Sequence, residues 1–258
     1  MSFISSRENK LKDMDIEKLY ISVDRQEYTL NWTERSDKRN TILTGICSAD
    51  NSTNYILGIH PNFDKTISKE FIQKEVFACE DHLKTPPFRK FARIWLDKDY
   101  SDSIQRSANN KKKKFANNLV EDIANTYENA QQRDDIEGFD SKTITEKLPD
   151  YGVQIHAEYT MIAHFHTLKK LFGNVGKWRF FLDQDSGIRG ACLSAFANEI
   201  KDRKAEAFYV CIEKNLTIDE KRKLKSLAKR KFDEVRKLNP GLSENDIKIK
   251  LLKQENSR

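Results

Sequence analysis

The chain has 258 residues, of which 38% are hydrophobic and 33% are charged, so it can bury a substantial core and is not an intrinsically disordered protein. Lys and Arg number 46 against 40 Asp and Glu, and the resulting net charge of +6 suits a polyanionic partner without requiring one. No apolar run approaches the roughly 18 residues of a membrane span, and the N-terminus lacks a basic lead-in to an apolar stretch. We therefore expect a cytoplasmic protein that does not contact a membrane.

The cysteines give no sign of a disulfide framework or a zinc site. They are far apart in the chain and form no CxxC pair: Cys47, Cys79, Cys192 and Cys211. We expect them to be small buried hydrophobic residues.

Three consecutive strands are predicted between residues 18 and 64. Residues 1–17 are a polar N-terminal tail, after which the stretch LYISVDRQEYTLNW alternates at the two-residue period of a strand, with Asp24 as an interruption. The segments NTILTGICSAD and YILGIHPNFD follow, separated by the turn signal DNSTN. An antiparallel meander is the simplest arrangement. A helix then begins after Ser68, which can cap it, with Phe71, Val76 and Cys79 near helical spacing.

Residues 85–150 are predicted to be an insertion that interrupts a core spanning residues 18–240. This stretch is polar and irregular, with one helix expected near 115–130 and a lysine run at 111–114 that is typical of a solvated loop. A polar C-terminal tail is expected over residues 241–258.

Helices and strands alternate after the insertion. The stretch IHAEYTMIAHFHTLKKLFG predicts a helix that ends at Gly173, and KWRFFLD predicts a strand. GIRGACLSAFANEIKDR predicts a helix, AEAFYVCIE a strand, and the segment that starts at Thr217 a long amphipathic helix that stops at the NPG of residues 239–241.

The order of these elements predicts an α/β fold in which a mixed sheet is flanked by helices, the architecture of ribonuclease H and its relatives. In such a sheet the first and fourth strands lie side by side, which would bring Asp24 close to Asp183. Clustered carboxylates repel one another unless cations lie between them. Mg²⁺ or Mn²⁺ held by carboxylate oxygens can activate a water or a 3′ hydroxyl in phosphodiester displacement.

Four passages together carry a family resemblance: ISVDRQEYTLNW, ILTGICSADNSTNYILGIHPNFD, GVQIHAEYTMIAHFHTLKKLF and WRFFLDQDSGIRGACLSAFANEI. In this order they resemble the integrase catalytic core of DDE-type bacterial insertion-sequence transposases, in the ribonuclease H-like superfamily. The resemblance covers roughly residues 18–240. It implies a polynucleotidyl transferase that uses magnesium, acts on DNA in the nucleoid, and works as a homo-oligomer on paired DNA ends.

The resemblance also implies which acids hold the metal. Asp24 is the expected first acid and Asp183 the second, with Asp185 as a rival or additional metal ligand. Asp185 could instead cap the helix that follows it. The third acid is expected on a helix after the last core strand, where Glu220 is the first choice and Glu234 the alternative; Asp50 is an alternative first acid.

Positive charge for the DNA backbone is expected on the long helix, either as a phosphate-binding surface or as the solvated face of an amphipathic helix. The residues concerned are Lys221, Arg222, Lys225, Lys229 and Arg230. His164 and His166 lie about 200° apart on a regular helix and cannot share one ion, so core or surface roles are expected for them. Core packing is likewise the expected role of Trp32, Trp95 and Trp178.

The fragment or divergent-member hypothesis follows from what the resemblance does not cover. The family usually carries a DNA-end-binding domain before the core, where this chain has about 17 residues. Two alternative functions therefore stay open: a catalytically inactive DNA-binding remnant, and a nuclease of the same fold without strand transfer.

Overall fold

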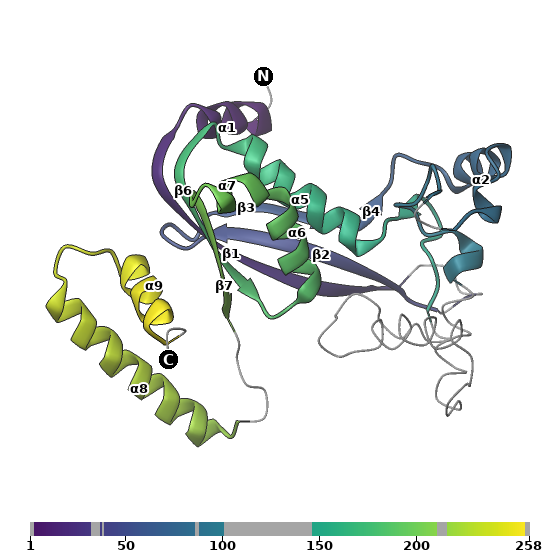
Figure 1. The fold of residues 1–258 in the computed structure, drawn as a ribbon. Coiled ribbons are helices and arrows are strands. Elements are labelled where there is room, and N and C mark those ends of the chain that lie inside the picture. The colour runs from purple at the N-terminus through teal and green to yellow at the C-terminus, as the bar shows by residue number, and fades with distance from the viewer. Residues whose placement is uncertain are drawn as a thin grey trace, which may run out of the picture.

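A mixed five-stranded β-sheet forms the centre of the molecule (Figure 1). The computed structural model describes residues 3–31, 37, 39–85, 88–100, 146–210 and 216–255. The strand order across the sheet is β3-β2-β1-β6-β7. The strands are β1 (Asp15–Leu30), β2 (Thr41–Asp50), β3 (Ile56–Pro61), β6 (Asn174–Asp183) and β7 (Ala205–Val210).

The pairing of the strands confirms the expected topology. Strands β1, β2 and β3 form an antiparallel meander, since β1 pairs with β2 and β2 with β3 in antiparallel register. Strand β6 pairs in parallel with β1, and β7 pairs in parallel with β6. Parallel neighbours need a crossover connection, which helices supply here. The first long strand and the fourth therefore lie side by side, although more than 100 residues separate them in the chain.

One face of the sheet is covered by helices and contains the main core. Helices α5 (Ala157–Leu171), α6 (Ser186–Ala195) and α7 (Ala197–Lys201) lie over it, and α1 (Phe3–Lys12) contacts α5 (Figure 1). The sheet supplies Ile21 and Phe180, the helices supply Phe165, and all three are fully buried. Apolar residues recur along α5 at helical spacing, so one stripe of the helix faces the sheet. Trp178 is 5% exposed, which confirms its expected role in packing.

The predicted helix over residues 187–203 is interrupted at Phe196. Helix α6 ends there and α7 begins directly afterwards, with Phe196 at φ −109° and ψ 21°. The Phe196 ring is fully buried and packs against Phe180 and Trp178. Burial of this ring accompanies a change of helix direction that the residue pattern did not indicate.

Among the described residues, helix α9 (Glu244–Glu255) packs on the opposite face of the sheet. Tyr20 of β1, Phe181 of β6 and Ile249 of α9 form a small separate core there. The expected polar C-terminal tail thus contains a helix that packs on the sheet. Helix α8 (Ile218–Leu238), the yellow-green helix in Figure 1, contacts α9 and has no buried residue among its described positions.

A smaller unit lies beyond the end of the sheet. It contains strands β4 (Phe63–Asp64) and β5 (Val153–Gln154), helix α2 (Lys69–Ala78) and the 3₁₀ turn η1 (Asp81–Leu83). Ser68 caps α2 as expected, since its side chain accepts a hydrogen bond from the Phe71 amide. The buried face of α2 is formed by Ile72 and Val76, whereas Phe71 is 56% exposed. The expectation that Phe71 lies on the buried face is therefore wrong, because α2 directs the neighbouring Ile72 toward Val153 of β5 instead.

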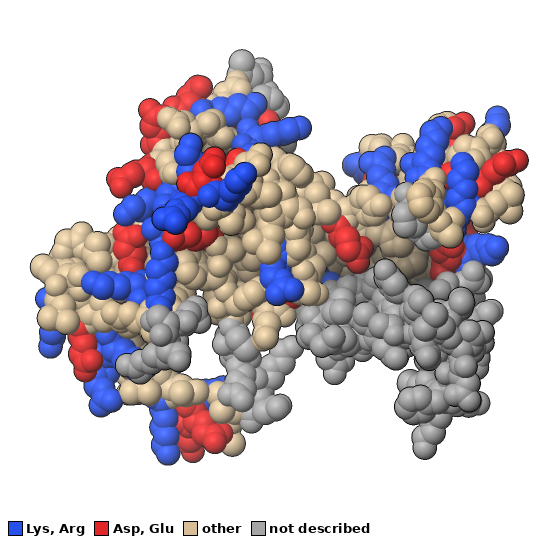
Figure 2. Space-filling view, in the orientation of Figure 1, with Lys and Arg blue, Asp and Glu red and all other residues tan. Residues whose placement is uncertain are grey.

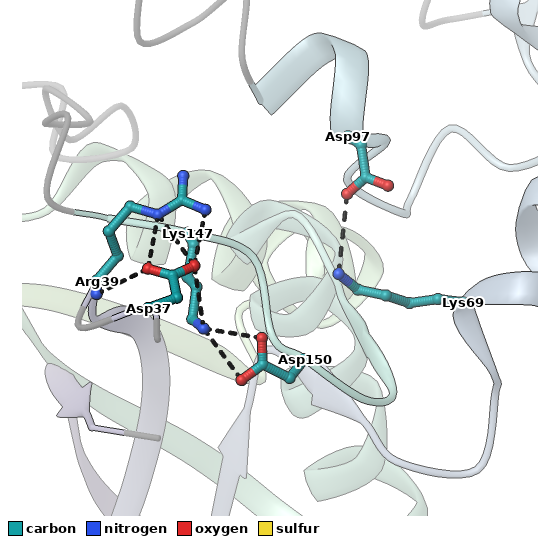
Figure 3. Close-up of polar contacts among 6 residues, drawn as sticks. All are labelled: Asp37, Arg39, Lys69, Asp97, Lys147 and Asp150. Carbon is teal, nitrogen blue, oxygen red and sulfur yellow. Dashed lines mark hydrogen bonds and ion pairs between the residues drawn. The ribbon is translucent and has the colours of Figure 1, made fainter. Parts of the chain in front are cut away.

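An ion-pair cluster joins the last residues of the predicted insertion to the connection between β1 and β2 (Figure 3). The Lys147 ammonium, nearly buried, lies 2.9 Å from Asp150 and 3.4 Å from Asp37. Arg39 also pairs with Asp37, at 2.8 Å. Hydrogen bonds from Arg39 hold the pKa of the Asp37 carboxyl well below its usual range. This cluster has two cations and two carboxylates and is electrically balanced.

Part of the sequence prediction lies outside the described residues. This applies to the helix near 115–130, the lysine run at 111–114, Trp32 and Cys211. Over the described ranges, no helix combines the length and the apolar content that crossing a membrane requires.

Candidate active site

Asp24 and Asp183 meet where β1 and β6 run in parallel. The register of the two strands pairs Val23 with Leu182, so the next residue on each strand is an aspartate. Val23 and Leu182 point into the helix-covered core, and alternation along a strand therefore turns both aspartates to the opposite face. Both are exposed. Neighbouring strands lie about 4.8 Å apart, which brings the two carboxylates within reach of a shared ion.

The exposure of Asp24 corrects one part of the sequence reasoning. A carboxylate inside an apolar strand suggests a buried charge that needs a partner. Asp24 is not buried, because it lies on the face of the sheet that α5 and α6 do not cover. The prediction that it lies beside Asp183 does not depend on burial.

Each carboxylate is positioned by its own backbone. One oxygen of Asp24 accepts a hydrogen bond from the Arg25 amide at 2.8 Å, and one oxygen of Asp183 accepts from the Gln184 amide at 2.8 Å. Among the described residues neither aspartate forms an ion pair. Cys47 lies opposite Asp24 on β2, and burial together with the Asp24 charge raises the pKa of its thiol. The site is therefore acidic and lacks a compensating cation from these residues.

Asp185 takes the capping role rather than joining this pair. Its carboxylate is 1% exposed and accepts hydrogen bonds from the amides of Gly187 at 2.6 Å and Ile188 at 3.1 Å, which makes it the N-cap of α6. Its other oxygen lies 3.1 Å from Nε of Arg25, whose side chain is also nearly buried. Asp183 and Asp185 diverge because the chain leaves the strand between them. Both oxygens of Asp185 are therefore already engaged, one with the amides of α6 and the other with Arg25.

The candidates for a third acid lie elsewhere. Glu220 is exposed and forms a capping box with Thr217 at the start of α8, where hydrogen bonds from Thr217 lower the pKa of the Glu220 carboxyl. Glu234 is exposed further along the same helix. Asp50 is 8% exposed and accepts hydrogen bonds from the turn residues Ser52 and Thr53. In the described part of the chain, no group of three or more His, Cys, Asp or Glu side chains could hold a metal ion.

The basic residues expected to contact DNA are exposed along α8. They are Lys221, Arg222, Lys225, Lys229 and Arg230. Arg222 lies 3.4 Å from Asp219 in a pair whose side chains are both more than three-quarters exposed, so that pair contributes little to stability. The apolar stripe of the helix is only partly covered, since Leu224 is 50% and Leu227 40% exposed.

Ser48 and His164, both buried, and the half-buried His60 form a chain of polar contacts between the sheet and α5, which the sequence alone did not indicate. Ser48 Oγ of β2 lies 2.6 Å from Nε2 of His164 of α5, and His164 Nδ1 lies 2.7 Å from Nδ1 of His60 of β3. Burial and the charge of His60 lower the pKa of His164 to about 3. The imidazole is therefore neutral at pH 7 and satisfies its polar atoms inside the core. Its position on the α5 stripe with Met161, Phe165 and Leu168 is the sequence signal that places it there.

No known family model, curated protein sequence or solved structure matches this chain. The argument for function therefore rests on the geometry of its own residues.

Proposed function

We propose that this chain is a ribonuclease H-like DNA transposase of the DDE type, which cleaves phosphodiester bonds and transfers strands. The observation that carries this proposal is the pairing of β1 with β6, which sets Asp24 and Asp183 side by side on an exposed face of the sheet. The strand order β3-β2-β1-β6-β7 supports it, since a three-stranded meander joined to parallel strands is the arrangement expected of a ribonuclease H-like core.

The donor set of the aspartate pair fits a hard divalent cation. Mg²⁺ and Mn²⁺ prefer carboxylate oxygens, and Asp24 and Asp183 offer them with no competing cation among the described residues. A bound divalent ion would supply activation of a water or 3′ hydroxyl and stabilise the leaving oxygen. The role of the protein residues is to hold and orient the ion. The Arg25 amide donates to one oxygen of Asp24 and the Gln184 amide to one oxygen of Asp183, which positions both carboxylates.

Glu220 is the proposed third acid of the catalytic centre. It lies on α8, a helix without buried residues, and its carboxylate is engaged in a capping box with Thr217. For Glu220 to reach the aspartate pair, α8 would have to change position when DNA binds and the carboxylate would have to leave its cap. The basic residues of α8 are the proposed DNA contacts, and paired DNA ends would be held by a homo-oligomer.

A catalytically inactive DNA-binding protein is the second candidate. One observation favours it: the described residues bring two acids together and no third metal ligand. A nuclease of the same fold, which cleaves without joining, would share the metal pair with the transposase.

Metal binding tests the site directly. Titration calorimetry with Mn²⁺ and Mg²⁺ on the full chain should show binding that Asp24→Asn and Asp183→Asn each abolish. Asp233→Asn, the same substitution at an exposed position of α8, is the matched control and should bind as the unaltered chain does. Binding that survives both substitutions at the pair would refute the assignment of the metal to these residues.

Activity assays separate the three functions. Joining of a cut 3′ end to target DNA supports the transposase, and the absence of joining in Glu220→Gln with metal binding retained supports the role of the third acid. Cleavage without joining identifies a nuclease. Salt-sensitive DNA binding with neither activity identifies the inactive DNA-binding protein.

A further inference from the structure

A basic pocket lies on the same face of the sheet as the aspartate pair, where α9 approaches β1 and β6. Its volume is about 460 Å³ and it is open to solvent. Lys18 of β1 and Arg179 of β6 contribute from the sheet, and Lys250 and Lys253 contribute from α9. Figure 2 shows Lys and Arg side chains gathered where α9 meets the sheet, with acidic side chains among them. None of these residues belongs to the aspartate pair or to the basic face of α8.

The positive charges of this pocket exceed the carboxylates that face them. Glu206 of β7 alone serves three cations: Arg179 at 2.8 Å, Lys253 at 2.8 Å and Lys177 at 3.3 Å. Burial raises the pKa of Glu206, but hydrogen bonding to Lys253 and the surrounding cations outweigh this and lower it overall. One ionised carboxylate therefore leaves two of the three positive charges uncompensated.

The other two lysines do not reduce this excess. Lys18 is balanced by Asp246, whose carboxylate lies 3.2 Å away. The Lys250 ammonium donates instead to the neutral side-chain oxygen of Asn239 at 2.7 Å, which adds a further uncompensated charge. Glu17 also lies 3.9 Å from Lys18, so the pocket and its edge carry five positive and three negative charges among the described residues.

Arg179 has an unsatisfied donor in the wall of the pocket. Its residue is 9% exposed, and its Nη1 lies 2.8 Å from Glu206. Its Nε is buried and makes no hydrogen bond within the described part of the chain. A buried donor without a partner costs about 1 to 3 kcal/mol, so a ligand that accepts from it gains that energy. The guanidinium fork of arginine matches the oxygens of a phosphate group.

We propose that this pocket binds a phosphate group of a nucleic-acid backbone. This inference rests on the proposed function and adds a specific phosphate-binding position to it. Arg179 precedes Asp183 by four residues on β6, which corresponds to about 13 Å along the strand. Helix α9 packs on Phe181 between these two positions, so a nucleic-acid backbone that engages both would pass over α9.

The test uses DNA binding by the full chain without metal, measured by fluorescence anisotropy of a labelled duplex between about 50 and 200 mM salt. Lys250→Gln and Lys253→Gln should each reduce the slope of log affinity against log salt, by up to about 0.9, because the two lysines share the neutralisation of one phosphate in the pocket. Lys248→Gln is the matched control, because Lys248 is exposed on the same helix and does not line the pocket. Equal slopes for all three variants would overturn the proposal.

Two further arms identify the donor and the source of the phosphate. In a ¹⁵N-labelled sample the Arg179 Nε–H resonance should shift when inorganic phosphate or the DNA duplex is added, and Lys253→Gln should raise the concentration needed for the shift about tenfold. A shift with DNA at micromolar concentration and with inorganic phosphate only at far higher concentration indicates the nucleic-acid backbone. The reverse order indicates a free phosphate compound and overturns the assignment to DNA, and no shift with either ligand overturns the site.

Failure of this inference is distinguishable from failure of the proposed function. Calorimetry with Mn²⁺ on Lys250→Gln and Lys253→Gln should match the unaltered chain, because the pocket does not include the aspartate pair. If Asp24→Asn loses metal binding but keeps the slope of log DNA affinity against log salt, the metal site and the phosphate site are both supported and are separate. Absence of metal binding in the unaltered chain refutes the catalytic proposal alone.

Discussion

The buried ion pair between Asp185 and Arg25 offers the sharpest test of how α6 is attached to the sheet. Asp185 is 1% exposed, caps the helix through two amides and lies 3.1 Å from Nε of Arg25. Substitution by Asn keeps a good N-cap and removes only the charge, whereas substitution by Ala removes both functions. The two variants therefore separate capping from ion pairing.

The expected magnitudes follow from the burial of both partners. Breaking a buried pair by removing one charge costs about 3 to 5 kcal/mol, and the lower figure applies here because Arg25 has further interactions. Asp185→Asn should then lower the melting temperature by about 6 to 12 °C, at about 2 to 4 °C per kcal/mol for a chain of this size. Asp185→Ala should cost about 1 kcal/mol more, because the cap is removed as well.

Urea unfolding and calorimetric melting measure these differences. Asp183→Asn is the matched control, since Asp183 is exposed at the end of β6, two residues before Asp185, and the substitution should change stability by less than about 0.5 kcal/mol. A double-mutant cycle with Arg25→Met should give a coupling energy of about 2 kcal/mol. A decrease in melting temperature of less than about 2 °C for Asp185→Asn would contradict the magnitudes above and refute the argument that this pair anchors α6.

Two other substitutions test local parts of the fold. Thr217→Ala removes the cap of α8, so hydrogen exchange in its first turn should become faster by the equivalent of about 1 kcal/mol and the pKa of Glu220 should rise toward its usual value; no change in either would contradict the capping box. The pKa of His164, lowered to about 3 by burial and by His60, lies below that of an unfolded histidine near 6.5. The unfolded chain then binds more protons below about pH 6.5, so this group stabilises the fold fully above that pH and progressively less down to about pH 3. The loss of stability between about pH 7 and pH 4.5 should be smaller in His164→Gln, and an identical loss would contradict the burial of a neutral imidazole.

Local patterns in the sequence were sufficient to predict most of the elements. The alternation in LYISVDR and KWRFFLD reflects a sheet with one buried face, which the structure shows at Ile21 and Phe180. Ser68 and Thr217 cap their helices as expected, because hydroxyl side chains satisfy free amides wherever a helix begins. These features depend on residues close together in the chain.

Other features could not be predicted, because they depend on which distant segments pack together. Phe196 interrupts a helix because its ring packs against β6, and Ile249 lies buried in what reads as a polar tail. The basic pocket joins residues of β1, β6, β7 and α9, whose positions in the sequence share no pattern. Hydrophobic periodicity shows which face of a helix or strand is buried, but it does not show which other element packs against that face.

The sequence by itself determined the order of the sheet strands and of most helices, the caps at Ser68 and Thr217, and the aspartates at residues 24 and 183, since propensity, period and turn chemistry act locally. Helices α1 and α9 lie in stretches that were predicted to be polar tails. Only the tertiary structure decided which carboxylates meet. The parallel register of β1 and β6 sets Asp24 beside Asp183 across more than 150 residues of chain. Asp185 follows Asp183 by two residues but points inward to Arg25, because the chain leaves β6 after Asp183 and begins α6. Glu220 lies on α8, where it forms a capping box with Thr217.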